Sequence, residues 1–209
     1  MRSSFVAVFV AALALAWAPA EAQQAKAVEP ARAAPVFDAA AIRRQAAQLA
    51  EFRTLLADPD PTVRLLTLRE AIRAGDATQR QMAIEMGLAS NESEMLELAL
   101  RGMMANIHQI IMEFVDAEGK LTTAGNTASL RLTVTQFDME TGQIQGTSAC
   151  NGTPKWSGQL QGVMLVFNAD TNMCSGSLTW VSDPGDFRGR VNLYSGQTEG
   201  NRNAIWKPR

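Results

Sequence analysis

Three patterns of hydrophobic and polar positions follow one another along the chain. Residues 5–17 form one unbroken apolar run, and residues 38–113 carry apolar positions at the three- and four-residue spacing of amphipathic helices. Residues 129–206 instead alternate apolar with polar positions in short segments, which is the period of a β-strand. The pattern therefore predicts an α+β protein, in which an N-terminal helical segment precedes a small antiparallel β module.

The helical segment is predicted to contain two helix–turn–helix units, over about residues 38–73 and 76–105. Asp38 is an N-cap candidate, and Asp58-Pro59-Asp60-Pro61 ends the first helix and caps the second, because proline fits a first helical turn but cannot continue the preceding helix. The last helix is predicted to run from Glu94 to about Glu113. A shift of 32 residues superimposes the apolar positions of the two units, with Phe52 on Ile84, Leu56 on Leu88, Leu66 on Leu98 and Ile72 on Met104.

The string Asp58-Pro59-Asp60-Pro61-Thr62-Val63-Arg64 resembles the Asp-Pro-x-x-Val-Arg sequence with which the second helix of a HEAT repeat begins. This resemblance spans residues 38–105 and implies protein or peptide binding along a helical face, not catalysis. Two units are fewer than the three or so that a stacked array needs, so a helical bundle stays open as the alternative to a solenoid. The candidate partner-binding residues are Arg64, Arg69 and Arg101.

The β module is predicted from alternating segments that Gly, Asn, Asp and Pro turns separate. Strands of this length and spacing form an antiparallel meander, closed into a barrel or folded into a sandwich. The predicted strands are Ser129 to Thr135, Gln143 to Ser148, Trp156 to Leu160, Val163 to Phe167, Ser175 to Val181, Phe187 to Tyr194 and Ala204 to Trp206.

The order of sequence motifs in these strands is similar to that of the avidin up-and-down barrels. The similarity rests on Gly142 to Thr147, Trp156 to Gln159, Leu178 to Trp180, Phe187 to Gly189 and Trp206 to Arg209. It implies an architecture only, because Ser148 stands where that family has Tyr and its opening Trp strand is missing, so no biotin site is expected.

The first 22 residues predict a secretory signal peptide. Arg2 precedes the apolar run of residues 5–17, and Ala20-Glu21-Ala22 has the small-x-small pattern of a cleavage site. The run is too short to span a hydrocarbon core, which needs about 20 residues, so no membrane span is expected after signal removal. The alanine-rich signal favours a bacterial, periplasmic (or secreted) protein. The expected organisation is signal peptide 1–22, flexible leader 23–37, HEAT-like helical segment 38–117, linker 118–127 and β module 128–209.

Charge and cysteine content narrow the function classes. Without Arg2 and Glu21 the mature chain has 18 basic against 20 acidic residues, a balance that gives no basic face for nucleic acid. The two cysteines, Cys150 and Cys174, are predicted to form a disulfide, because an exported chain meets an oxidising compartment. One histidine and two paired cysteines leave no zinc ligand set, so no metal and no cofactor is expected.

Catalysis is the least favoured of three function classes. His108 lies among Met104, Ile107 and Ile110 and is interpreted as a core or boundary residue rather than a catalytic base. The acid pairs Asp138 with Glu140 and Asp183 with Asp186 flank turns, where aspartate bonds to the local backbone, so a hydrolase is only the third hypothesis.

Two binding hypotheses remain. The leading one is an exported, non-catalytic protein of the cell envelope that binds a protein or peptide through its helical segment. The alternative is a small-ligand or glycan binder, since sugar sites combine flat aromatic faces with planar amides. Its candidate ligand-binding residues are Trp156, Trp180, Tyr194 and Trp206.

Overall fold

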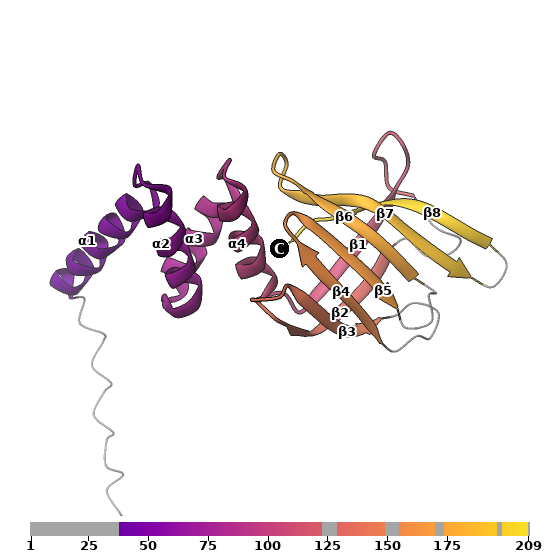
Figure 1. Cartoon of the computed structure of the whole chain (residues 1–209), viewed down its shortest axis with the longest axis horizontal. Coiled ribbons are helices and arrows are strands. Elements are labelled where there is room, and N and C mark those ends of the chain that lie inside the picture. The colour runs from indigo at the N-terminus through magenta and orange to yellow at the C-terminus, as the bar shows by residue number, and fades with distance from the viewer. Residues whose placement is uncertain (1–37, 123–128, 149–154, 170–173, 196–197, 209) are drawn as a thin grey trace, which may run out of the picture. The chain divides into compact units, whose positions relative to one another are not determined.

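The computed structural model describes residues 38–122, 129–148, 155–169, 174–195 and 198–208. An N-terminal group of helices is followed by an antiparallel β-barrel, so the predicted α+β class is confirmed (Figure 1). The helices of the described chain are α1 (Ala39–Leu56), α2 (Pro61–Ala74), α3 (Ala77–Leu88) and α4 (Ser93–Met104).

The boundaries between the helices follow the capping residues. The Asp60 carboxylate accepts a hydrogen bond from the Thr62 amide at 2.8 Å, and Pro61 occupies the first turn of α2. Asp76 and Gln79 form a reciprocal capping box at the start of α3, with the Gln79 amide donating to the Asp76 carboxylate at 2.8 Å. The turn predicted at residues 58–61 is therefore confirmed.

Eight antiparallel strands in the described chain close into a barrel: each strand pairs with the next along the chain, and β1 pairs with β8. This up-and-down order decides between the two predicted architectures in favour of the barrel. The strands are β1 (Gln109–Val115), β2 (Ser129–Phe137), β3 (Gln143–Ser148), β4 (Trp156–Gln161), β5 (Met164–Ala169), β6 (Cys174–Val181), β7 (Asp186–Ser195) and β8 (Thr198–Trp206).

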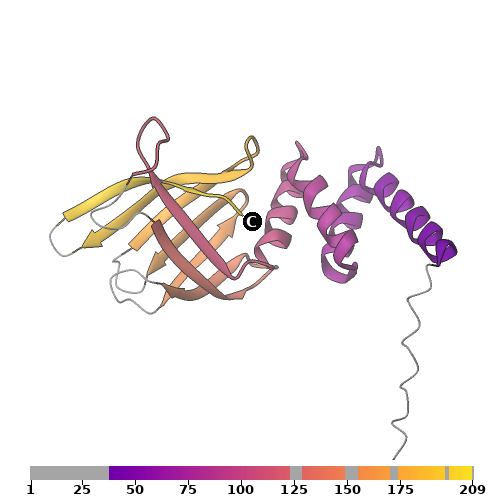
Figure 2. The same cartoon turned by 180° about the vertical axis from the view of Figure 1, so that it is seen from behind.

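Strand β1 occupies residues for which the sequence pattern predicted a helix. The helix predicted from Glu94 to about Glu113 is wrong, because α4 ends at Met104 and β1 follows after a short connection (Figure 2). Side chains of β1 alternate between buried and exposed, with Ile110, Met112 and Phe114 fully buried. Pairing with β2 on one side and β8 on the other overrides the helical spacing of these apolar residues.

The barrel interior is a packed apolar core that α4 shares. Leu100 and Met104 of α4, both fully buried, belong to the same cluster of buried side chains as Trp156, Phe167 and Phe187 of the barrel. Residues 40–209 accordingly form one compact unit. The expected linker begins only after β1, and Leu121 within it forms a β-bridge with Val115, while residues 123–127 lie outside the described part.

A second, smaller core holds the helices together. It contains Leu56 of α1, Leu68 and Ile72 of α2, Ile84 of α3 and Met95 of α4. Among the described helices none is both long enough and apolar enough for a membrane crossing. The predicted signal peptide and leader lie outside the described residues.

Candidate functional site

Arg64, one of the candidate partner-binding residues, is occupied within the molecule. Its guanidinium forms an ion pair with Glu92 at 2.6 Å and donates to the Pro59 carbonyl at 3.0 Å and to the Asp58 carbonyl. The side chain is only 20% exposed. Arg64 therefore ties the α1–α2 turn to the residue that precedes α4, and this role limits its availability to a partner.

Arg101 has a similar internal role at the junction with the barrel. It pairs with Glu97 at 2.6 Å and donates to the Met139 carbonyl at 3.1 Å and to the Glu140 carbonyl, both in the β2–β3 turn. Asp138 organises the same turn by accepting from the Glu140 and Thr141 amides at 2.8 and 2.9 Å. These backbone hydrogen bonds, with a smaller contribution from the charge of Arg101, hold the pKa of Asp138 below its ordinary value.

Arg69 differs from the other two arginines because it is exposed and makes no ion pair within the described chain. It lies one turn after Leu66, which is 54% exposed, so the two side chains share one face of α2. On α1, Ile42 and Leu55 are 48% and 40% exposed. The structure thus leaves large apolar side chains of α1 and α2 in contact with solvent, beside one free cation on α2.

The candidate tryptophans do not form an open aromatic mouth. Trp156 and Trp206 are each 2% exposed. The Trp156 indole donates to the Thr133 carbonyl at 3.0 Å, and Trp206 stacks on Phe187 with a centroid separation of 5.0 Å. Both rings are therefore part of the barrel core.

Trp180 and Tyr194 lie at different places along the barrel wall. Trp180 is half-buried near the end of β6 and makes an edge contact with Phe187, at a centroid separation of 5.2 Å. Tyr194 lies on β7 opposite Glu199 of β8, and its side chain lies outside the described part. The structure therefore does not gather the four predicted aromatic residues into one site.

The cysteine prediction falls partly outside the structure. Cys174 begins β6 and is buried, whereas Cys150 lies among residues 149–154, outside the described residues. The Cys150–Cys174 disulfide stays a prediction.

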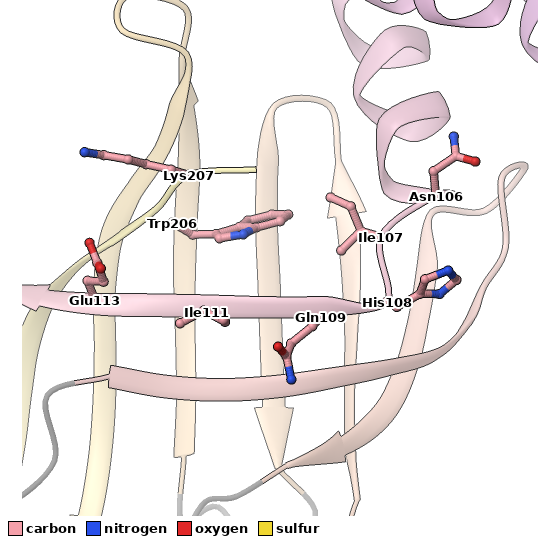
Figure 3. A pocket seen from close by; sticks show the side chains of 8 residues that line it. All are labelled: Asn106, Ile107, His108, Gln109, Ile111, Glu113, Trp206 and Lys207. Atoms are coloured by element: carbon pink, nitrogen blue, oxygen red, sulfur yellow. The ribbon is translucent and has the colours of Figure 1, made fainter. Parts of the chain in front are cut away.

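A groove with a volume of about 390 Å³ lies where β1 separates from the end of β8 (Figure 3). Figure 3 shows Ile107 and Trp206 pointing toward one another beside β1. The lining residues are Asn106, Ile107, His108, Gln109, Ile111, Glu113, Trp206 and Lys207. The sequence pattern did not indicate this groove, because residues 106–113 fit a helix and the apolar run from Ile110 to Met112 interrupts a strand alternation.

The groove contains the only histidine of the chain, but no catalytic arrangement around it. The interpretation of His108 as a core or boundary residue is wrong, since it is exposed in the connection between α4 and β1. Its imidazole makes no hydrogen bond or ion pair with another described residue, so neither a nucleophile nor an orienting carboxylate accompanies it. The described residues also contain no group of three or more His, Cys, Asp and Glu side chains that could hold a metal.

The two acid pairs serve the local structure of turns and strands. Asp138 caps the β2–β3 turn, as described above. Asp186 is buried and accepts from the Arg188 guanidinium at 2.8 and 3.1 Å, a pairing that raises the pKa of Arg188. Each of these two carboxylates is therefore committed to a hydrogen bond within its own hairpin or strand.

Comparison with known proteins identifies no relative. No family model, no curated protein and no solved structure matches the chain. The resemblances to HEAT repeats and to avidin barrels therefore lack support from any relative, and the barrel architecture stands on the strand pairing alone.

Proposed function

We propose that this chain is an exported, non-catalytic binding protein of the cell envelope that docks another protein through α1 and α2. The observation that carries the proposal is the exposure of Ile42, Leu55 and Leu66, at 48%, 40% and 54%. They are half of the large exposed apolar side chains of the described chain, and exposed apolar surface rimmed by polar residues marks interaction sites. The other large exposed apolar residues of the described chain lie on the barrel and the turn after β1: Ile111, Leu121 and Val166.

Charge defines the kind of partner. Arg53 and Ile42 point to nearly the same side of α1, and Arg69 shares a face of α2 with Leu66. Neither arginine is paired within the described chain, so each can pair with a carboxylate of the partner. We therefore expect a protein whose docking surface places Asp or Glu side chains beside apolar ones.

Stacking of the two helical units in the manner of HEAT repeats is part of this proposal. The ion pair between Arg64 and Glu92 supports it, because it connects the start of α2 in the first unit to the residue that precedes α4 in the second. The signal-like sequence of residues 1–22 supports export to the periplasm, with Gln23 as the mature N-terminus. Glycan binding by the barrel, the alternative from the sequence, lacks a favouring observation, since Trp156 and Trp206 are enclosed in the core.

The proposal is tested by capture from an envelope extract with the mature full-length protein and two matched variants. Leu66→Glu places a like charge beside the partner's carboxylates, and Leu121→Glu makes the same change at a side chain that is 65% exposed in the turn after β1. We expect Leu66→Glu to lower recovery of the captured protein at least about tenfold, the loss of about 1.4 kcal/mol of binding free energy, and Leu121→Glu to leave it unchanged. Equal recovery with both variants would refute docking on α2.

A further inference from the structure

The pairing of β1 is unequal on its two sides. Residues 109–113 pair with β2, but only residues 113–115 pair with β8. β8 ends at Trp206, so the first half of β1 has no strand on that side within the described chain.

The direction of the hydrogen bonds identifies the open backbone groups. The Val134 amide donates to the His108 carbonyl at 2.9 Å, so His108 is bonded toward β2. Bonding directions alternate along an antiparallel strand, so Ile110 and Met112 also bond toward β2, whereas Gln109 and Ile111 point their N–H and C=O groups away from it. Continuing the β8 register would place Lys207 opposite Ile111, but no hydrogen bond joins these two residues. Within the described chain, the N–H and C=O groups of Gln109 and Ile111 therefore line an open strand edge; the same register would place Arg209, which lies outside the described residues, opposite Gln109.

This edge opens into the groove of Figure 3. The wall opposite it is formed by Trp206 and Lys207, where the chain turns away from β1, and Ile107 adds an apolar side chain. Native proteins cover or block exposed edges, because an open edge accepts another strand. Here the edge lies beside a concave space instead of being covered.

We propose that this edge binds an extended polypeptide segment, which adds as a short strand antiparallel to β1. The spacing of the open groups decides the chemistry of the occupant: donors and acceptors that repeat every two residues, about 6.8 Å apart, are matched by another extended backbone. Ile107 and Ile111 offer apolar contacts to its side chains, and Glu113 lies at the end where the amino terminus of an antiparallel segment would enter. This site is independent of the docking surface on α1 and α2.

The test uses amide hydrogen exchange and NMR on the mature full-length protein. The probe is the peptide acetyl-Thr-Val-Thr-Val-Thr-amide, and its control is the same peptide with every peptide nitrogen methylated. In the free protein we expect the Gln109 and Ile111 amides to exchange at least about tenfold faster than those of Ile110 and Met112. Millimolar probe should shift and protect the two open amides, and the methylated control should do neither.

Three results would overturn the proposal. Protection of Gln109 and Ile111 in the dilute free protein would mean that the chain closes its own edge, and protection that grows with protein concentration would mean that a second copy occupies it. No response to the probe, or an equal response to the methylated control, would exclude backbone pairing with a peptide. As a further check, Ile111→Pro removes the Ile111 N–H, which faces the open side, and removes no hydrogen bond to β2. This variant should no longer show a probe-induced shift or protection of the Gln109 amide. If the variant does not fold, the comparison of the two peptides on the native protein still decides.

Discussion

Replacing Leu100 by alanine should destabilise the helices and the barrel together. Leu100 lies on α4, is fully buried, and belongs to the cluster of side chains that fills the barrel. Truncation removes its packing from a site enclosed by both parts of the molecule. We expect a loss of about 3 kcal/mol in the free energy of unfolding, the usual cost of Leu→Ala in a core, including the cavity it leaves.

The assay is urea unfolding followed by two signals. Fluorescence reports on the barrel, because Trp156, Trp180 and Trp206 all lie on its strands, and circular dichroism at 222 nm reports mainly on the helices. With a urea dependence of about 2 kcal/mol per M, the loss corresponds to a midpoint lower by about 1.5 M. Both signals should move by this amount, because the two parts share one core.

Leu66→Ala is the matched control, because it makes the same chemical change at a side chain that is 54% exposed. Its midpoint should fall by no more than about 0.25 M, since surface substitutions mostly stay within about 0.5 kcal/mol. If Leu100→Ala lowers the dichroism midpoint but leaves the fluorescence midpoint unchanged, packing against α4 does not stabilise the barrel, and the prediction of joint destabilisation is refuted.

Three further outcomes follow from single sites. Gly146→Ala should lower the free energy of unfolding by about 2 kcal/mol or more in thermal melts, because a Cβ there would lie 1.7 Å from the Thr133 carbonyl oxygen; an unchanged melt would contradict the register of β2 and β3. The pKa of Asp138 is lowered in the folded protein from 3.8, so the stabilisation from its carboxylate is complete above pH 3.8 and disappears as the pH falls through the lowered pKa. When the pH is lowered below about 4, the urea midpoint of Asp138→Asn should therefore fall less than that of the native protein. Equal falls in the two midpoints would contradict this. Titration of the unreduced, denatured mature protein should find no thiol, because Cys150 and Cys174 are expected to be bonded; two titratable thiols would refute the disulfide.

The sequence predicted those elements whose pattern is local. The turn at Asp58–Pro61 follows from capping chemistry, and seven of the eight strands follow from alternation between turn residues. β1 was missed because Ile107, Ile110 and Ile111 also fit helical spacing, and only pairing with β2 and β8 decides between the two conformations. Long-range pairing is not present in a local pattern.

The candidate site was less predictable for the same reason. Nothing in the sequence distinguishes Arg64 from Arg69, yet in the fold Arg64 forms an ion pair with Glu92 and Arg69 is exposed. Trp156 and Trp206 were interpreted as possible ligand contacts, whereas closure of the barrel turns both rings into its core. The groove beside β1 depends on where β8 stops pairing, which composition does not encode.

The docking of another protein on α2 is tested most directly by site-specific photo-cross-linking in cells that export the protein. A photoreactive amino acid is placed at position 66 in one variant and at position 121 in another, both in the full chain. We expect a discrete cross-linked adduct from position 66, no adduct from position 121, and loss of the first adduct when Arg69→Glu is added. Equal adducts from both positions, or none from position 66, would contradict it.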